Sequence, residues 1–194
     1  MTIGVSRMRN KDLDKYVIPV FCETGDCGVG FFSGNLFITA GHVIHDNNTH
    51  IYFNGRVHDL KEDKAIKLFV TDPDGDDELQ NDYAIFKFDR VDSPIRLGHY
   101  TPQIGESLTC ISFIHDPSML GTPEGDIVRV KYQGQVSRNV FNFFECKMDV
   151  VLHPGSSGSP IMNGNEVLGI LSGNLSSSDP HDILFQSASD IEPL

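Results

Sequence analysis

The sequence predicts an all-β protein of sandwich or barrel type, divided into two similar halves. Short apolar or alternating runs recur along the 194 residues, and turn-forming residues separate them. No helical period of 3.6 residues persists beyond the first residues, and a segment rich in Pro and Gly interrupts the pattern near the middle. Because a chain of this length accommodates one compact unit or two small halves with a shared core, we expect each half to be a small barrel.

The first half is expected to span residues 16–93. Residues 1–15, which are polar and mixed in charge, would form a short helix or extension ahead of it. Six apolar or alternating runs within this half are interpreted as strands. They cover residues 17–22, 28–33, 35–40, 50–53, 65–70 and 83–88. The dipeptide Asn54-Gly55 predicts a tight turn after the fourth strand.

The second half is expected to span residues 106–194, after a linker at 94–105. Pro94, Gly98, Pro102 and Gly105 predict that this linker forms no regular element. Six further runs are interpreted as strands. They cover residues 107–114, 127–136, 140–148, 160–162, 167–172 and 183–187.

Composition excludes several classes of function. With 15 basic and 27 acidic residues, the formal net charge is −12, which argues against nucleic acid as a partner.

The sequence contains no apolar run of membrane-spanning length and begins without an apolar signal segment, so we expect a cytoplasmic protein with no membrane partner. The four cysteines are too few and too scattered for a disulfide framework, and we expect all four to be reduced, although Cys22 and Cys27 lie close enough to pair.

The most informative segment is the glycine- and serine-rich stretch at 153–160. Ser157 lies between small residues, so a tight loop there would expose its hydroxyl. The backbone N–H groups of Gly155 and Ser157 would then point at a substrate. Taken alone, the pattern is more typical of a flexible turn, and only two other segments favour the functional interpretation.

Those segments supply a histidine and an acid. His42 follows an apolar run through small residues, and Asp82 opens a run of apolar residues further along the chain. A hydroxyl nucleophile at neutral pH needs a base to take its proton, and the base needs a buried acid to fix its tautomer. All three residue types are present in the order His, Asp, Ser.

With these motifs, the sequence resembles the chymotrypsin-like serine peptidases from about residue 17 to the end. The segments 37–43, 81–86 and 153–160 match the family's motifs. No cysteine flanks His42 or Ser157, and in this respect the sequence resembles cysteine-poor bacterial or viral members of the family. The resemblance implies two six-stranded antiparallel β-barrels with an active site in the cleft between them. It also implies that His42 is the general base, Asp82 its orienting partner and Ser157 the nucleophile that forms an acyl-enzyme. Gly155 and Ser157 would form the oxyanion hole.

Ser156 is a departure from the secreted trypsins. Trypsin-like zymogens have an aspartate at this position, which pairs with a newly cut N-terminus, and a serine cannot do so. We therefore expect no zymogen switch of that type. The nucleophile loop is expected to be either preformed or organised by a substrate or a separate regulatory partner chain.

The resemblance also locates a pocket for the substrate residue before the scissile bond. Its expected walls are Val151, Leu152, His153 and Pro154 on one side, and Ile170, Leu171, Ser172 and Gly173 on the other. Val151 stands where trypsins have a carboxylate, which argues against cleavage after Lys or Arg. Glu- and Gln-cleaving members place a histidine where this chain has Ile170, and His153 is either a substitute donor or a residue of the cleft rim. We expect a mainly apolar pocket.

Neither a cofactor nor a metal is expected. The acidic residues at 72–78 match part of a calcium loop but lack its final glutamate, so a solvated acidic loop is favoured over a calcium site. His42, His45, His50 and His58 lack the ligand pattern of a metal cluster. Cys110 and Cys146 fall on expected strands and are interpreted as core residues.

The leading function is that of a serine endopeptidase acting on protein or peptide substrates. One alternative is a protease-fold module that binds peptides or partners without cutting them. Another is a viral protease that processes a polyprotein. An intact set of His42, Asp82 and Ser157 favours the enzyme over the binding module.

Overall fold

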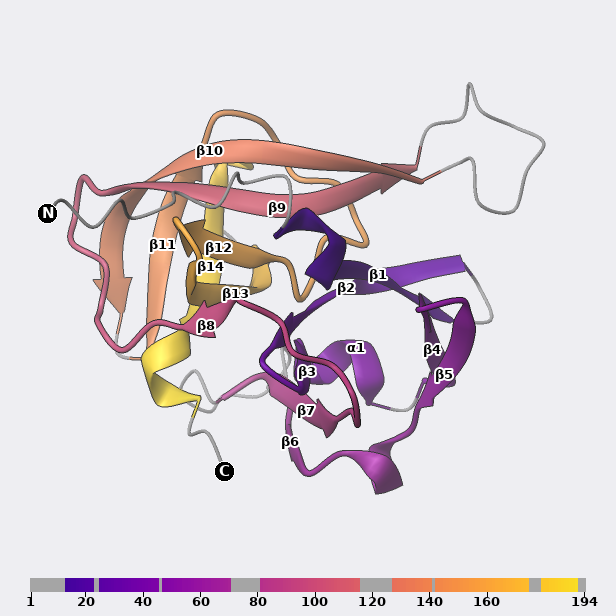
Figure 1. Ribbon diagram of the computed structural model, residues 1–194. Helices are drawn as coiled ribbons and strands as arrows, with labels where there is room; N and C mark the ends of the chain where they lie inside the picture. Colours follow the sequence, from indigo (N-terminus) through magenta and orange to yellow (C-terminus); the bar gives the residue numbers. More distant parts are fainter. Residues whose placement is uncertain are drawn as a thin grey trace, which may run out of the picture.

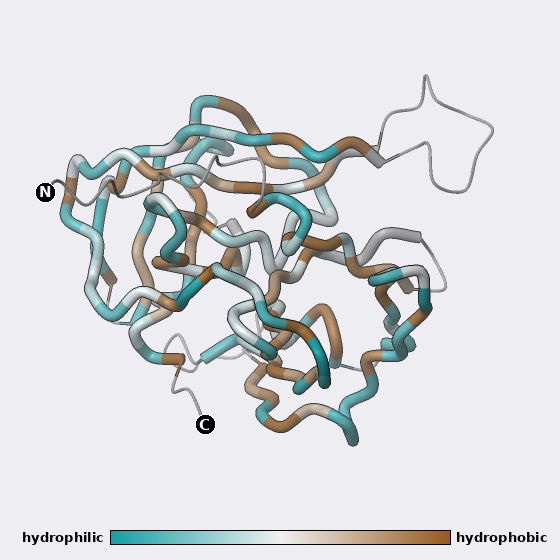
Figure 2. Tube along the Cα trace, in the orientation of Figure 1, coloured by the Kyte–Doolittle hydropathy of each residue, from teal (hydrophilic) through white to brown (hydrophobic). Residues whose placement is uncertain are grey.

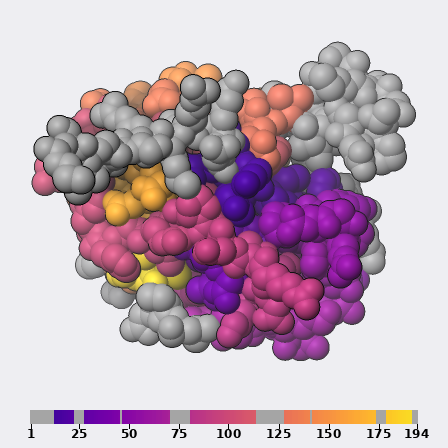
Figure 3. Space-filling model, viewed as in Figure 1, coloured from indigo at the N-terminus to yellow at the C-terminus, as the bar shows by residue number. Residues whose placement is uncertain are grey.

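The computed structural model describes residues 13–22, 25–45, 47–70, 81–115, 127–140, 142–174 and 179–191. Figure 1 shows two β-units side by side, one from each half of the chain. The segment that joins the two units, which includes residues 94–105, runs across the face seen in Figure 3. The predicted all-β class is confirmed.

The N-terminal half is a curled sheet of seven antiparallel strands in the order β5-β4-β1-β2-β3-β7-β6. Its strands are β1 (Val17–Cys22), β2 (Gly25–Ser33), β3 (Leu36–Thr39), β4 (Thr49–Phe53), β5 (Arg56–Leu60), β6 (Lys67–Phe69) and β7 (Tyr83–Lys87). Helix α1 (Gly41–Ile44) follows β3, and 3-10 turns lie at Asp14–Tyr16 and Glu62–Lys64. Among the described residues, no pairing joins the outer strands β5 and β6, so this half remains an open half-barrel.

The C-terminal half closes on itself. It contains β8 (Arg96–Leu97), β9 (Ser107–His115), β10 (Ile127–Val140), β11 (Phe143–Met148), β12 (Pro160–Asn163), β13 (Glu166–Asn174) and β14 (Asp182–Ser187), with a 3-10 turn at Ala188–Asp190. Strand β12 pairs with both β9 and β13, which closes a barrel of six strands. The seventh strand, β8, adds to β13 in parallel.

Two strands were not predicted, β5 and β8. Asn54 and Gly55 both have positive φ angles, 50° and 72°, so the predicted tight turn forms and β5 returns directly beside β4. Strand β5 has only one buried residue, Leu60, and therefore lacks the apolar alternation that marks a half-buried strand. The segment predicted to be a linker without regular structure contains β8, whose Arg96 and Leu97 pair with Glu166 and Val167.

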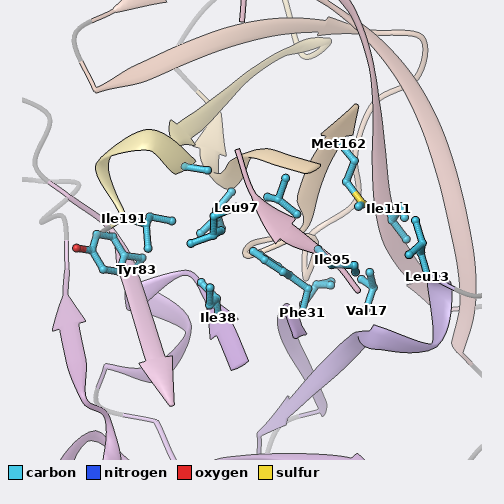
Figure 4. Packing of buried hydrophobic residues seen from close by; sticks show 14 of the residues in the cluster. Leu13, Val17, Phe31, Ile38, Tyr83, Ile95, Leu97, Ile111, Met162 and Ile191 are labelled. Carbon is cyan, nitrogen blue, oxygen red and sulfur yellow. The ribbon is translucent and has the colours of Figure 1, made fainter. Parts of the chain in front are cut away.

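Three apolar clusters hold the fold together. One lies inside each half, and the third, which we call the central cluster, joins the two halves. Figure 4 shows Phe31, Ile38 and Tyr83 of the N-terminal half packed toward Ile95 and Ile191 in this cluster. Hydrophobic and hydrophilic residues alternate along β9 and β10 in Figure 2, as expected for strands with one face on a core. The central cluster therefore fixes how the two halves face each other.

The expectation of four reduced cysteines is wrong for Cys22, which is disulfide-bonded. The side chain of Cys27 lies outside the described residues, as do the N-terminal residues 1–12 of the expected helix. Cys110 and Cys146 are free and fully buried, as expected for core residues.

No helix among the described residues has the length and apolar character needed to cross a bilayer.

Candidate active site

His42 lies on α1, immediately after the buried strand β3. The preceding Gly41 is required by close packing, because a Cβ there would lie 1.8 Å from the carbonyl oxygen of Phe69 and 3.0 Å from Asp82 Oδ1. This approach lets the start of α1 rest directly on the end of β6 and on the Asp82 carboxylate. The backbone N–H of His42 donates a hydrogen bond of 2.9 Å to Asp82 Oδ1.

The Asp82 carboxylate is almost fully buried, with 1% of the residue exposed, yet both of its oxygens have partners. Oδ2 lies 2.7 Å from His42 Nδ1 and accepts a 2.6 Å hydrogen bond from Ser172 Oγ. A buried carboxylate is tolerated only when such donors replace its lost hydration. Because the ionised Asp82 carboxylate can only accept a hydrogen bond, Nδ1 carries the ring proton, and the neutral imidazole has its lone pair on Nε2. The pair can therefore act as a base at Nε2.

Ser157 lies in the loop between β11 and β12. Gly155 and Gly158, which flank it, have φ angles of 87° and 85°, a backbone region that favours glycine. The Gly158 N–H donates to the Leu171 carbonyl over 2.8 Å, and the Ser159 N–H donates to the Ser156 carbonyl over 3.1 Å. These bonds give the loop a defined tight conformation within the C-terminal barrel.

The same loop is docked onto the N-terminal half. The Ser157 carbonyl accepts a 2.7 Å hydrogen bond from the Val29 N–H. A Cβ at Gly158 would lie 2.0 Å from the Val29 carbonyl oxygen and 2.6 Å from Thr39 Oγ1. Since Thr39 ends the strand that leads into α1, the loop that carries Ser157 packs against the segment that carries His42.

The expected oxyanion donors have no competing partner. Among the described residues, neither the Gly155 N–H nor the Ser157 N–H donates to a hydrogen-bond acceptor. Two unpaired amides on one turn are able to stabilise a negatively charged oxygen. Ser156, between them, is only 3% exposed, and its hydroxyl has no partner within the described part of the chain.

A hollow of about 250 Å³ lies beside the loop. Five of the eight expected pocket residues line it: Leu152, His153, Pro154, Leu171 and Gly173. A Cβ at Gly173 would meet nothing within 4 Å, so this wall is left open by the missing side chain. The lining contains no carboxylate, lysine or arginine.

The other three expected pocket residues lie elsewhere. Val151 is exposed and does not line the hollow, and Ile170 is fully buried in the central cluster. Ser172 points at Asp82 instead of a substrate. Ile170 packs in the central cluster and Ser172 bonds to Asp82, so both face the N-terminal half, whereas Leu171 packs in the cluster of the C-terminal half.

Sequence reasoning missed a residue that contacts the main chain of the acid, and the partner of that residue. Gln186 accepts a hydrogen bond from the Asp82 backbone N–H, and Asn81 in turn accepts one from Gln186. No motif or spacing distinguishes Gln186, because 104 residues separate it from Asp82. Only the docking of the two halves brings them together.

The histidines that were weighed as a metal cluster have other neighbours. His50 stacks on Phe21, His58 contacts Phe88 edge to face, and His45 Nδ1 lies 3.2 Å from Glu62 Oε1. No group of three or more metal-binding side chains occurs within the described ranges. The acidic segment weighed as a calcium loop, 72–78, lies outside the described residues.

A comparison with family models matches residues 28–170 to the trypsin-like peptidase domain. The chain belongs to the trypsin-like peptidase family. The matched region of this trypsin-like peptidase begins in β2 and ends in β13, and so includes His42, Asp82 and Ser157. The comparison with curated proteins gives no significant match.

Solved structures of trypsin-like proteins share the fold at low identity. The active form of the Rv3671c protease from M. tuberculosis has a TM-score of 0.66 at 15% identity, with 98% of this chain and 91% of that chain covered. The human pathogenic astrovirus serine protease has a TM-score of 0.58 at 18% identity, with 93% of this chain and 94% of that chain covered. The scabies mite inactivated protease paralogue S-I1 has a TM-score of 0.67 at 14% identity, covering 97% of this chain and 96% of that chain. Because an inactivated paralogue matches as well as a protease, fold alone does not decide catalysis.

Proposed function

We propose that this trypsin-like peptidase is a serine endopeptidase that uses Ser157, His42 and Asp82. The observation that carries the proposal is the buried Asp82 carboxylate, which holds both the backbone N–H and the Nδ1 of His42. A buried acid in this position fixes the imidazole ring and stabilises it when it becomes charged. A module that only binds peptides has no need for such an arrangement.

In the proposed reaction, Ser157 Oγ attacks the carbonyl carbon of the scissile peptide bond while His42 Nε2 takes the hydroxyl proton. The Gly155 and Ser157 N–H groups bind the oxygen of the tetrahedral intermediate, at roughly 3–4 kcal/mol for each donor. His42 then gives its proton to the leaving amine, and the bond to that amine breaks. In the second half of the reaction, His42 takes a proton from water as the water oxygen attacks the acyl carbon. The ester bond to Ser157 Oγ then breaks, His42 returns the proton to Oγ, and the carboxylic acid product leaves.

The loop is proposed to be competent without a zymogen switch. Ser156 supplies a neutral hydroxyl that cannot form an ion pair with a new N-terminus, and it is buried between the two donor amides. The hydrogen bonds of Gly158 and of the Ser157 carbonyl support a preformed loop, since they involve residues on both halves. Activity should therefore not require removal of residues 1–15.

The pocket is proposed to accept an apolar side chain before the scissile bond. Its walls are formed by Leu152, Pro154 and Leu171, and an apolar substrate side chain gains free energy when it leaves water for such a surface. His153 is exposed and belongs to the rim in this proposal. A peptide library should give preferred cleavage after apolar residues, and a clear preference for Glu, Lys or Arg would contradict the proposal.

The activity itself is tested by comparing two serine variants. Ser157→Ala should reduce peptide hydrolysis by at least 10³-fold, because the nucleophile is lost while the fold remains. Ser137→Ala, which removes an exposed hydroxyl on β10, is the matched control and should retain activity. Hydrolysis that survives in Ser157→Ala would rule out the assigned nucleophile.

A further inference from the structure

Gln186 is the residue of the C-terminal barrel that holds the backbone of Asp82. Its side-chain Oε1 accepts the Asp82 N–H over 2.5 Å, and its Nε2 donates to Asn81 Oδ1 over 2.8 Å. Because the Asp82 backbone N–H can only donate, the atom of the Gln186 side-chain amide that faces it must be the oxygen. The amide nitrogen of Gln186 then faces Asn81 and donates to it. The side chain is completely buried, with 0% of the residue exposed.

The backbone of Gln186 is fixed on both sides. In the barrel, Gln186 pairs with Phe143 of β11 and with Ile170 of β13. Its neighbour Phe185 faces the C-terminal core, so the alternation of the strand turns Gln186 toward the N-terminal half. Gln186 therefore presents a hydrogen-bonding group from a rigid sheet to the start of β7.

Asp82 is consequently held from the C-terminal barrel by two different residues. Ser172 of β13 binds its carboxylate, and Gln186 of β14 binds its main chain. The remaining partner of the carboxylate is His42. Among the described residues, Asp82 is the group that hydrogen-bonds to both the backbone N–H and the Nδ1 of His42, so the position of Asp82 determines the position of the imidazole.

We propose that Gln186 is a positioning residue that sets Asp82, and through it His42, relative to Ser157. This inference rests on the proposed function, and it adds that catalytic geometry depends on a bond between the halves. The nucleophile belongs to one half, while the base and acid belong to the other. A small displacement between them is costly, since an error of about 1 Å in a catalytic group lowers the rate by roughly 10²-fold.

Three substitutions test the positioning role. Gln186→Met keeps the length of the side chain and removes both hydrogen bonds, and it should lower kcat by about 10- to 100-fold with little change in KM. Gln186→Glu keeps an acceptor for Asp82 but removes the donor to Asn81 and adds a charge near Asp82. Asn81→Ala removes only the outer partner of Gln186 and should give a smaller loss of kcat.

The control variant is Gln135→Met. Gln135 donates its side-chain N–H to the Gly105 carbonyl on the surface of the same barrel, so the substitution removes a glutamine hydrogen bond away from Asp82. We expect wild-type kcat and KM for this variant. Circular dichroism and thermal unfolding establish that each variant is folded, and if Gln186→Met does not fold, Asn81→Ala carries the test.

A second readout is independent of peptide hydrolysis. The proton between His42 Nδ1 and Asp82, which are 2.7 Å apart, should give a downfield NMR resonance in the wild-type protein. This resonance should broaden or move upfield in Gln186→Met and remain in place in Gln135→Met. Wild-type kcat together with an unchanged resonance in the folded Gln186→Met variant would overturn the proposal. If the wild-type protein hydrolyses no peptide, the proposed function fails, and the resonance still decides whether Gln186 positions the pair.

Discussion

The two halves of the molecule bury their cores by different arrangements of strands. The C-terminal half closes into a barrel, because β12 pairs with β9 on one side and β13 on the other. The N-terminal half leaves β5 and β6 as outer strands, and its interior is filled with phenylalanine rings. Phe32 has ring neighbours at 5.0 Å in Phe37, 4.5 Å in Phe53 and 5.2 Å in Phe88.

This difference indicates how the site is assembled. The loop that carries Ser157 sits on the closed barrel, where strand pairing constrains its two ends at β11 and β12. His42 and Asp82 sit on the open half, whose orientation depends on the central cluster and on hydrogen bonds between the halves. We infer that catalytic geometry is more sensitive to the junction between the halves than to the outer strands of either.

The largest effect is expected when the acid of the open half loses its charge. Asp82→Asn should lower kcat by roughly 10⁴-fold, because an amide presents the wrong hydrogen-bonding pattern to His42 Nδ1 and cannot stabilise the imidazolium. Steady-state kinetics on a peptide substrate measures this effect. An Asp82→Asn variant within tenfold of wild type would indicate that His42 does not act through Asp82.

The junction itself is tested by two glycines with similar backbone angles. Gly158 and Gly164 have φ of 85° and 64°, but a Cβ at Gly158 would collide with Val29 whereas a Cβ at Gly164 would meet nothing within 4 Å. Gly158→Ala should lower the free energy of unfolding by about 3–5 kcal/mol and abolish activity. Gly164→Ala should cost about 1–2 kcal/mol and leave activity intact. Equal effects in denaturant unfolding would contradict the packing of the loop on the open half.

The cores of the halves are compared by one truncation in each. Phe32→Ala and Phe185→Ala should each cost about 3–5 kcal/mol, with the larger loss at Phe32 because it has three aromatic neighbours. Phe185 stacks on a single ring, that of Phe144, at 5.7 Å. Urea unfolding of both variants measures the difference. A larger loss at Phe185 would indicate that closure of the barrel matters more than aromatic packing.

The smallest effect concerns the thiols of the closed barrel. Burial raises the pKa of the Cys110 thiol well above its ordinary range and raises the pKa of Cys146 to about 12. The thiolate is the reactive form, so both cysteines should react with iodoacetamide only when the protein unfolds. Mass spectrometry of the native and urea-unfolded protein compares the two states, and rapid native labelling would show that the barrel opens.

Much of the fold could be predicted because the apolar pattern matches the strands. Strand β1 has the predicted bounds, and the Asn54-Gly55 turn forms as expected. Strand β5 exposes most of its side chains and β8 has only two residues, so neither produces the alternation on which prediction depends. The disulfide at Cys22 contradicts the prediction of reduced thiols, because the scattered spacing of four cysteines does not exclude a single local bond.

The candidate site could be predicted only in part. His42, Asp82 and Ser157 stand in recognisable local motifs, and the structure brings their segments together. The contact of Ser172 with Asp82 could not be predicted, because Ser172 lies 90 positions after Asp82 in the sequence. Gln186 has no local signature at all. Such contacts form only when the two folded halves dock, and local sequence patterns do not show which distant residues will then meet.

The central claim is that His42 and Asp82 of the open half activate Ser157 of the closed barrel. Reaction with a fluorophosphonate probe, followed by mass spectrometry of the labelled peptide, tests it most directly. We predict a single adduct on Ser157 in the wild-type protein, loss of that adduct in Ser157→Ala, and labelling slowed at least 10²-fold in His42→Ala. Folded wild-type protein that takes up no probe, or labelling of Ser157 that is unchanged in His42→Ala, would contradict the account.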